Sequence, residues 1–253
     1  HINTPANGQN FSAPATITIA ASASDDDGNI ARVEFYQNSS LLGEDQSSPF
    51  SFVWCNISPG NYVLMAKVYD NDGASSTGSA TISVTGSIQR EVWTGITGTG
   101  VSAIPVNSTP SGISDLTVFA APANQGSNFG SRIRGYVRVP SSGSYIFWIA
   151  SDDNGELWLS TNGDPANKSR IAFVPGHTSV RQWNKYVSQQ SVPINLVAGQ
   201  QYYIEALYKE ASGVDHLAVG WQLPDASQER PIPGNRLVPF EGGTVAMMNM
   251  ARA

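Results

Sequence analysis

Two adjacent aspartates, Asp152 and Asp153, are the residues of this chain whose types and spacing most clearly suggest a chemical role. They occur in SDDNGELWL (residues 151–159), after the apolar run YIFWIA and before ELWL, which predicts a tight connection between two strands. Neighbouring carboxylates repel each other, so a partner must offset that repulsion. In a turn without any metal ion, one of the carboxylates would accept backbone N–H groups.

A catalytic role for the pair is not favoured. Glycoside hydrolysis uses two carboxyl groups about 5–10 Å apart on opposite sides of the scissile bond, with pKa values pushed apart. Two carboxylates on adjacent residues do not meet that need. The sequence also has no G-x-S-x-G elbow, no H-E-x-x-H motif and no glycine-rich phosphate loop. We therefore expect a non-catalytic chain.

The segments that must position these residues are short, alternating and separated by turn clusters, which predicts an all-β fold with very little helix. Only 13% of the residues are charged, and the chain holds 24 Gly and 15 Pro. The pattern changes once along the chain, so we expect a first β-sandwich at residues 1–86 and a second all-β domain at residues 87–241. Residues 242–253 are expected to be a linker or tail.

Composition excludes several function classes. The chain has 14 Lys plus Arg against 20 Asp plus Glu and no basic cluster, which makes nucleic acid an unlikely partner. No run of about 18 apolar residues is present, so no membrane insertion is expected. The single cysteine, Cys55, excludes an intramolecular disulfide. Because the chain starts without a signal peptide, we expect it to belong to a larger protein with flanking domains.

The first half contains ANGQNFSAPATITIAASASDDDGNIARVEFYQ and then GNYVLMAKVYDNDGASS. These segments resemble a bacterial immunoglobulin-like repeat, which implies an immunoglobulin-like β-sandwich that acts as a spacer. Its acidic residues, Asp25, Asp26, Asp27, Asp70 and Asp72, could converge on Ca²⁺, but ordinary Asx-type turns are favoured.

The second half contains RGYVRVPSSGSYIFWIASDDNGELWLS, VPINLVAGQQYYIEALYKEASGVDHLAVGW and RPIPGNRLVPF, in that order. This set resembles the protective-antigen-type (PA-fourteen) domain of yeast flocculins, fungal adhesins and bacterial glycosidases. The resemblance implies a β-sandwich or barrel-like fold. In the lectin members, two consecutive aspartates joined by a cis peptide bond hold Ca²⁺, which binds the glycan, and Asp152 and Asp153 match that pair.

The resemblance also implies a second loop that completes the calcium shell, between the strands QYYIEALYKE and HLAVGW. We expect Asp215 to be the third carboxylate ligand and a backbone carbonyl near Gly213 to add an oxygen. The fungal pattern has an Asn in this loop, where the present chain has Ser212 and Gly213.

The expected glycan contacts are Asp152, Asp153, Asn154, Trp183 and His216. Trp183 is included because RQWNKY surrounds it with polar residues in a long connection, where an exposed stacking residue is natural.

The remaining tryptophans near the pair are expected to be structural. Trp148 and Trp221 lie in strongly apolar strands, and Trp158 is also expected in the core.

The sequence thus predicts a calcium-dependent carbohydrate-binding module of a larger secreted or cell-surface bacterial protein. Two alternatives stay open. One is a structural or adhesive spacer module with a purely structural calcium. The other is an accessory fragment of a glycoside hydrolase whose catalytic domain lies elsewhere.

Overall fold

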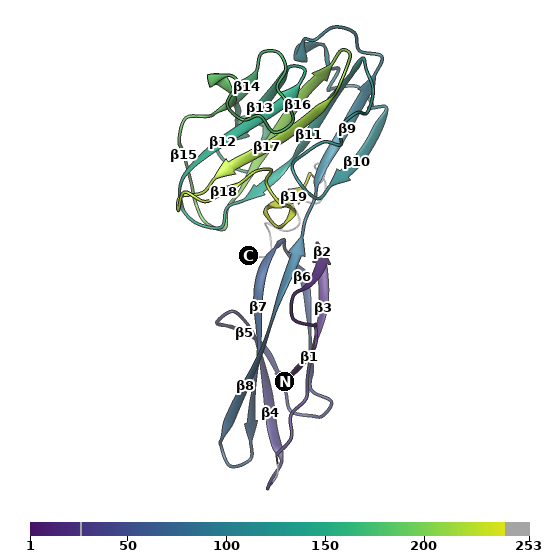
Figure 1. Cartoon of the computed structure of the whole chain (residues 1–253). Coiled ribbons are helices and arrows are strands. Elements are labelled where there is room, and N and C mark those ends of the chain that lie inside the picture. The colour runs from purple at the N-terminus through teal and green to yellow at the C-terminus, as the bar shows by residue number, and fades with distance from the viewer. Residues whose placement is uncertain (26, 241–253) are drawn as a thin grey trace. The chain divides into compact units, whose positions relative to one another are not determined.

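The computed structural model describes residues 1–25 and 27–240 (Figure 1). The chain divides into two compact units, His1–Gly86 and the residues from Ser87 onward. The described part is built from strands, with short 3-10 helices at η1 Val101–Ala103, η2 Pro165–Asn167, η3 Val187–Gln189 and η4 Gly234–Arg236. The predicted all-β fold is confirmed, while the expected tail at residues 242–253 lies outside the described residues.

The first unit is a β-sandwich. Its strands are β1 Ile2–Thr4, β2 Gln9–Ser12, β3 Ala15–Ala21, β4 Ile30–Gln37, β5 Ser40–Asp45, β6 Ser51–Ile57, β7 Gly60–Asp70 and β8 Ser75–Thr85. They form two sheets with the orders β1-β3-β6 and β2-β8-β7-β4-β5. Apolar and polar residues alternate along β3, so that Ile17 and Ile19 point into the core.

The second unit is built around its own core. Its strands are β9 Ile88–Thr94, β10 Gly112–Leu116, β11 Phe129–Arg138, β12 Gly143–Asp152, β13 Gly155–Ser160, β14 Lys168–Val174, β15 Ile194–Leu196, β16 Gln201–Glu210, β17 His216–Gln222, β18 Gln228–Glu229 and β19 Leu237–Pro239. One sheet has the order β10-β9-β11-β16-β13-β14, with β19 also pairing with β11, and the other has the order β15-β12-β17-β18. Their inner faces share one apolar cluster, to which Phe147 of β12 and Ile204 of β16 both belong.

Two connections cross from one sheet to the other at the same end of this unit. The first joins β12 to β13 and the second joins β16 to β17. Asp152 pairs with His216 in one sheet, and Gly155 pairs with Tyr208 in the other. This register brings the last residues of β12 and β16 together, although they are far apart in sequence.

The tryptophans of the second unit differ in burial. Trp148 and Trp221 are buried, as predicted. The expectation that Trp158 belongs to the core is wrong, because β13 alternates and points Leu157 and Leu159 inward instead. Trp158 is half-buried on the opposite face.

No helix in the described residues is long and apolar enough to cross a membrane.

Candidate metal centre

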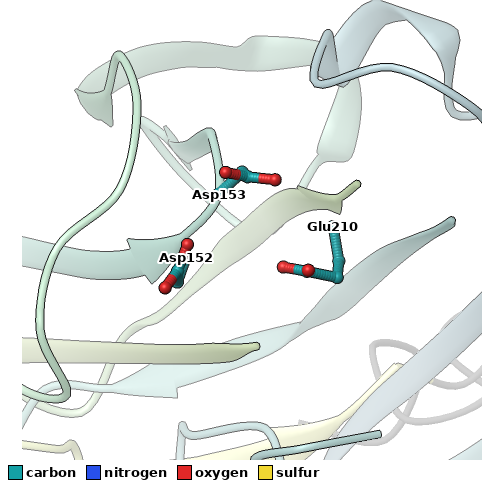
Figure 2. A group of neighbouring side chains, drawn as sticks. All are labelled: Asp152, Asp153 and Glu210. Carbon is teal, nitrogen blue, oxygen red and sulfur yellow. The ribbon is translucent and has the colours of Figure 1, made fainter. Parts of the chain in front are cut away.

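Asp152, Asp153 and Glu210 form one carboxylate group (Figure 2). Each offers an oxygen, and the three oxygens lie within 4.8 Å of one another. Asp152 ends β12 and Glu210 ends β16, so each sheet of the unit contributes a carboxylate. Figure 2 shows the carboxylate of Glu210 directed towards the two aspartates. The peptide bond between Asp152 and Asp153 is cis, as the resemblance implies.

Hydrogen bonds fix the aspartate pair against the end of β16. The backbone N–H of Asp153 donates to the carbonyl of Lys209 at 3.2 Å, and that of Lys209 donates to the carbonyl of Asn154 at 2.9 Å. The Asp153 carboxylate accepts the backbone N–H of Ala211 at 3.0 Å. The Ser151 hydroxyl donates to the Asp153 carbonyl at 2.8 Å. The pair is therefore held in place before any ligand binds.

Glu210 is the least satisfied member of the group. Its side chain is 0% exposed, and neither carboxylate oxygen has a hydrogen-bond partner in the described residues. Burial, followed by the charges of Asp153, Asp152 and Asp215, raises the pKa of Glu210 to about 7. Buried polar groups without partners are costly and rare. A hard cation would satisfy both oxygens, so this donor set fits Ca²⁺.

Asp152 lies on the more open side of the group. Burial, followed by the charge of Asp153, raises its pKa, whereas His216, His177 and Lys185 act in the opposite direction. The side chains of Asp152 and Asp153 are half-buried, in contrast to that of Glu210. The group therefore has a closed side and a side that faces the surface.

Asp215, the predicted third ligand, is not a member of the group of three. It is completely buried, and its Oδ2 accepts the backbone N–H groups of Gln125 and Gly126. Its Oδ1 is buried without a partner in the described residues. Gly213 lies on the exposed loop before it, with a φ of +114° that favours glycine. The ligand roles of Asp215 and Gly213 stay predictions.

The three other predicted glycan contacts, His216, Asn154 and Trp183, differ in burial. His216 is 4% exposed, and its Nε2 lies 3.0 Å from the carbonyl oxygen of Thr178. Asn154 and Trp183 are half-buried, and the ring of Trp183 is 5.9 Å from the guanidinium carbon of Arg230. Their contacts with a glycan also stay predictions.

Glu210 is the residue that sequence reasoning missed. Tyr202, Ile204, Ala206 and Tyr208 alternate along β16 and belong to the core. The same period of two places Glu210 on the core side of its strand. An acidic residue that continues a core-facing row was the signal that could have identified it.

Asp70, one of the acidic residues of the first unit, behaves as an ordinary turn residue. Asp70 Oδ1 accepts the backbone N–H groups of Asp72 at 2.9 Å and Ala74 at 2.8 Å. The Asx-type interpretation is thus confirmed for Asp70, while Asp26 lies outside the described residues.

Comparisons with known proteins agree with this organisation. The family model of the bacterial Ig domain matches residues 1–84, and that of the PA14 domain matches residues 60–235, so the two matches share residues 60–84.

Among curated proteins, the mouse (Mus musculus) N-acetyl-beta-glucosaminyl-glycoprotein 4-beta-N-acetylgalactosaminyltransferase 1 is 40% identical over 100 residues. The match covers 38% of this chain and 10% of that protein. Mouse fibrocystin-L is 34% identical over 96 residues, which cover 38% of this chain and 2% of fibrocystin-L. The chain therefore spans a tenth or less of the length of these relatives.

A solved PA14 sugar-binding domain from an RTX adhesin is also similar, with 10% identity and a TM-score of 0.47. The match covers 61% of this chain and 98% of that one. Because the PA14 model matches well over half of its residues, the chain belongs to the PA14 domain family, and it carries a bacterial Ig domain at its amino-terminal end.

Proposed function

We propose that the second unit is a calcium-dependent carbohydrate-binding module of a larger secreted or cell-surface bacterial protein, with the first unit as its spacer. The observation that carries the proposal is the buried Glu210 carboxylate, whose two oxygens lack partners in the described chain beside Asp152 and Asp153. Membership of the PA14 family supports a glycan as the ligand class.

In this proposal, Asp152, Asp153 and Glu210 hold the ion through carboxylate oxygens. Asp215 Oδ1 and the carbonyl of Gly213 are further candidate ligands. Calcium takes about 6–8 oxygen ligands, so when bound it would offer remaining positions to sugar hydroxyls. Glu210 closes the inner side, so those positions would open past the half-buried Asp152 and Asp153.

A hydrolytic role is the less favoured alternative. A glutamate with a pKa of about 7 next to two aspartates has the proton affinity of a general acid. A general acid must, however, come within hydrogen-bond reach of the leaving oxygen. Glu210 is 0% exposed and cannot meet a glycosidic bond at the surface. We therefore propose binding without catalysis in this chain.

The affinity of one site for a glycan is expected to be modest. A polar sugar gives up good hydrogen bonds to water, and the site contacts only a small part of an extended glycan. We expect a dissociation constant in the micromolar to millimolar range, equivalent to about −8 to −4 kcal/mol.

A glycan-array screen tests the proposal when it is run with Ca²⁺, with chelator, and with the variants Asp152→Asn and Asp153→Asn. The matched control is Asp225→Asn, because Asp225 is an exposed acid of the same unit that only accepts hydrogen bonds within its own turn. Loss of binding with chelator and with both variants, but not with the control, is the expected result.

Glycan binding that survives chelation would contradict the proposal. Calorimetry distinguishes a calcium ion that binds the glycan from one that only stabilises the fold. In that case the protein would bind Ca²⁺ and melt at a lower temperature after chelation, but no glycan would bind under any condition.

A further inference from the structure

The guanidinium of Arg230 lies over an aromatic ring of the strand that carries Asp152. Its guanidinium carbon is 3.6 Å from the centre of the Trp148 ring, within the range of a cation–π contact. Trp148 is paired with Gly220 across the sheet. A Cβ atom at position 220 would come within 2.5 Å of Arg230 Cγ and 3.1 Å of its Cα. Glycine at this position therefore lets the arginine lie across the sheet.

Arg230 has no carboxylate to neutralise it within the described residues. No hydrogen bond or ion pair of its guanidinium occurs there, and its Nε is buried without a partner. Other arginines of the same unit, Arg132, Arg134 and Arg236, each contact a glutamate at 2.5–2.9 Å. Burial lowers the pKa of Arg230, yet guanidinium stays protonated in proteins. A positive charge thus remains available in a chain of net charge −6.

The position of Arg230 relates it to the candidate metal centre. Trp148 and Asp152 lie four residues apart on β12, so both are on the face opposite to the core-facing Phe147 and Ile149. At about 3.3 Å per residue, their Cα atoms are about 13 Å apart. That separation corresponds to a few sugar residues of one glycan chain.

The connection at residues 175–190 lies close both to the aspartate pair and to Arg230. Thr178 donates its backbone N–H to the Ser151 carbonyl at 2.9 Å, which holds the connection beside the aspartates. Further along, the Trp183 ring centre is 5.9 Å from the Arg230 guanidinium carbon.

The charge of this connection has one sign. His177 and Lys185 lie near enough to Asp152 to act on its charge. Residues 165–204 contain no Asp or Glu, although acidic residues exceed basic ones in the whole chain. The connection beside Asp152 therefore carries basic side chains and no acidic ones.

We propose that Arg230, seated on Trp148, binds the carboxylate of an acidic sugar that lies a few residues along the same glycan held at the calcium centre. The planar guanidinium can donate two parallel hydrogen bonds to a carboxylate, and its contact with the Trp148 ring restricts its position. The inference rests on the proposed function, since it names the class of glycan that the same module selects.

Matched glycan pairs that differ in charge test this subsite. One pair is tetragalacturonic acid and its methyl ester, and the other is sialyllactose and lactose. In the presence of Ca²⁺ we expect the acidic member of at least one pair to bind about tenfold more tightly or better, as one charge-assisted contact would give. Arg230→Met should remove this preference and leave binding of the neutral member unchanged.

Two further variants separate charge from packing. Arg230→Lys keeps the positive charge but loses the planar guanidinium that donates two parallel hydrogen bonds, so part of the preference for the acidic sugar should remain. Arg170→Met removes an arginine that is paired with Glu156 at 2.7 Å on the other sheet, and it should retain the full preference. An unchanged melting temperature of each variant shows that its fold is retained.

The outcomes distinguish the subsite from the calcium centre. Equal binding of the acidic and neutral members, or an unchanged preference in Arg230→Met, overturns the subsite. Calcium-dependent binding of the neutral sugar in the same experiment still upholds the proposed function. An acid preference that depends on Arg230 but survives chelation upholds the subsite and overturns the calcium dependence. Tighter binding of a sulfated galactose tetrasaccharide than of either acid overturns the assignment to a carboxylate.

Discussion

The two units of this chain both contain clustered acidic residues, and the clusters differ in how their oxygens are used. In the first unit, Asp70 accepts two backbone N–H groups of its own turn. In the second unit, Glu210 is completely buried, and its two oxygens accept no hydrogen bond in the described chain. Asp152 and Asp153 bring two more carboxylates within 4.8 Å.

In the proposed function, burial and unmet hydrogen-bonding capacity, and not the number of acids, distinguish the candidate cation site from the turn. An exposed carboxylate keeps its water and can order a turn at little cost. A buried carboxylate has lost its water and needs a proton, a donor or a cation. Runs of aspartate are conspicuous in both halves of the sequence, but only the second half adds a buried acid to them.

The largest expected effect comes from removing a carboxylate of the second unit. Glu210→Gln and Asp153→Asn should each weaken Ca²⁺ binding by more than about a hundredfold, because each removes a charge from a small shell of hard ligands. Isothermal titration with CaCl₂ measures the change. Calcium affinity within a few-fold of the unmodified protein in Glu210→Gln would show that this residue is only a buried acid.

Calcium should also separate the two units by thermal stability. A ligand at about one hundred times its dissociation constant stabilises the folded state by about 2.7 kcal/mol, which raises the melting temperature of a unit of this size by about 5–10 °C. Calorimetry should show that Ca²⁺ shifts the transition of the second unit and leaves that of the first unchanged. A shift of both transitions would place a calcium site in the first unit as well.

Much of the fold followed from the sequence because strand alternation and turn residues are local signals. The all-β architecture, the buried Trp148 and Trp221, and the two family resemblances were all predicted correctly. Trp158 was assigned to the core because it lies in an apolar run. Its partly exposed position depends on which face of β13 packs inward, and this is decided by the opposite sheet.

The candidate site was only partly predictable for a related reason. Asp152 and Asp153 are adjacent in sequence, so one motif identifies them. Glu210 joins them through the register of β13 against β16, which pairs Gly155 with Tyr208. Arg230 reaches Trp148 only because Gly220 leaves room across the sheet. Contacts of this kind depend on strand pairing between distant segments, which a single sequence does not specify.

Acidic pH should weaken calcium binding to the second unit. The pKa of Glu210 is raised to about 7, so the ion-free site carries a proton at lower pH that calcium must displace. We expect the affinity to fall as the pH decreases from about 8 to about 6, by up to about tenfold per pH unit below 7. Titrations with CaCl₂ across this range measure the slope, and Asp225→Asn should retain it.

The same proton has the opposite effect on the ion-free fold. A carboxyl whose pKa is raised by folding binds its proton more tightly in the folded state, so the ion-free second unit should gain stability as the pH falls from about 7 towards about 4. Denaturant melts in chelator test this trend. A stability of the ion-free unit that rises with pH across that window would mean that Glu210 is ionised and satisfied without calcium.

The smallest effect on calcium is expected from the first unit. Asp70→Ala removes the acceptor of two backbone N–H groups, which should destabilise that unit by about 1 kcal/mol, as the loss of a comparable cap does. Calcium affinity should not change, since Asp70 ties its own turn and contributes to no carboxylate group of the kind found around Glu210 in the described residues. Denaturant unfolding of Asp70→Ala measures the change in stability, and calcium titration of the same variant measures its calcium affinity. A loss of calcium binding in Asp70→Ala would mean that the turn carboxylates exchange their backbone partners for an ion, and that satisfied hydrogen bonds do not distinguish the two acidic groups.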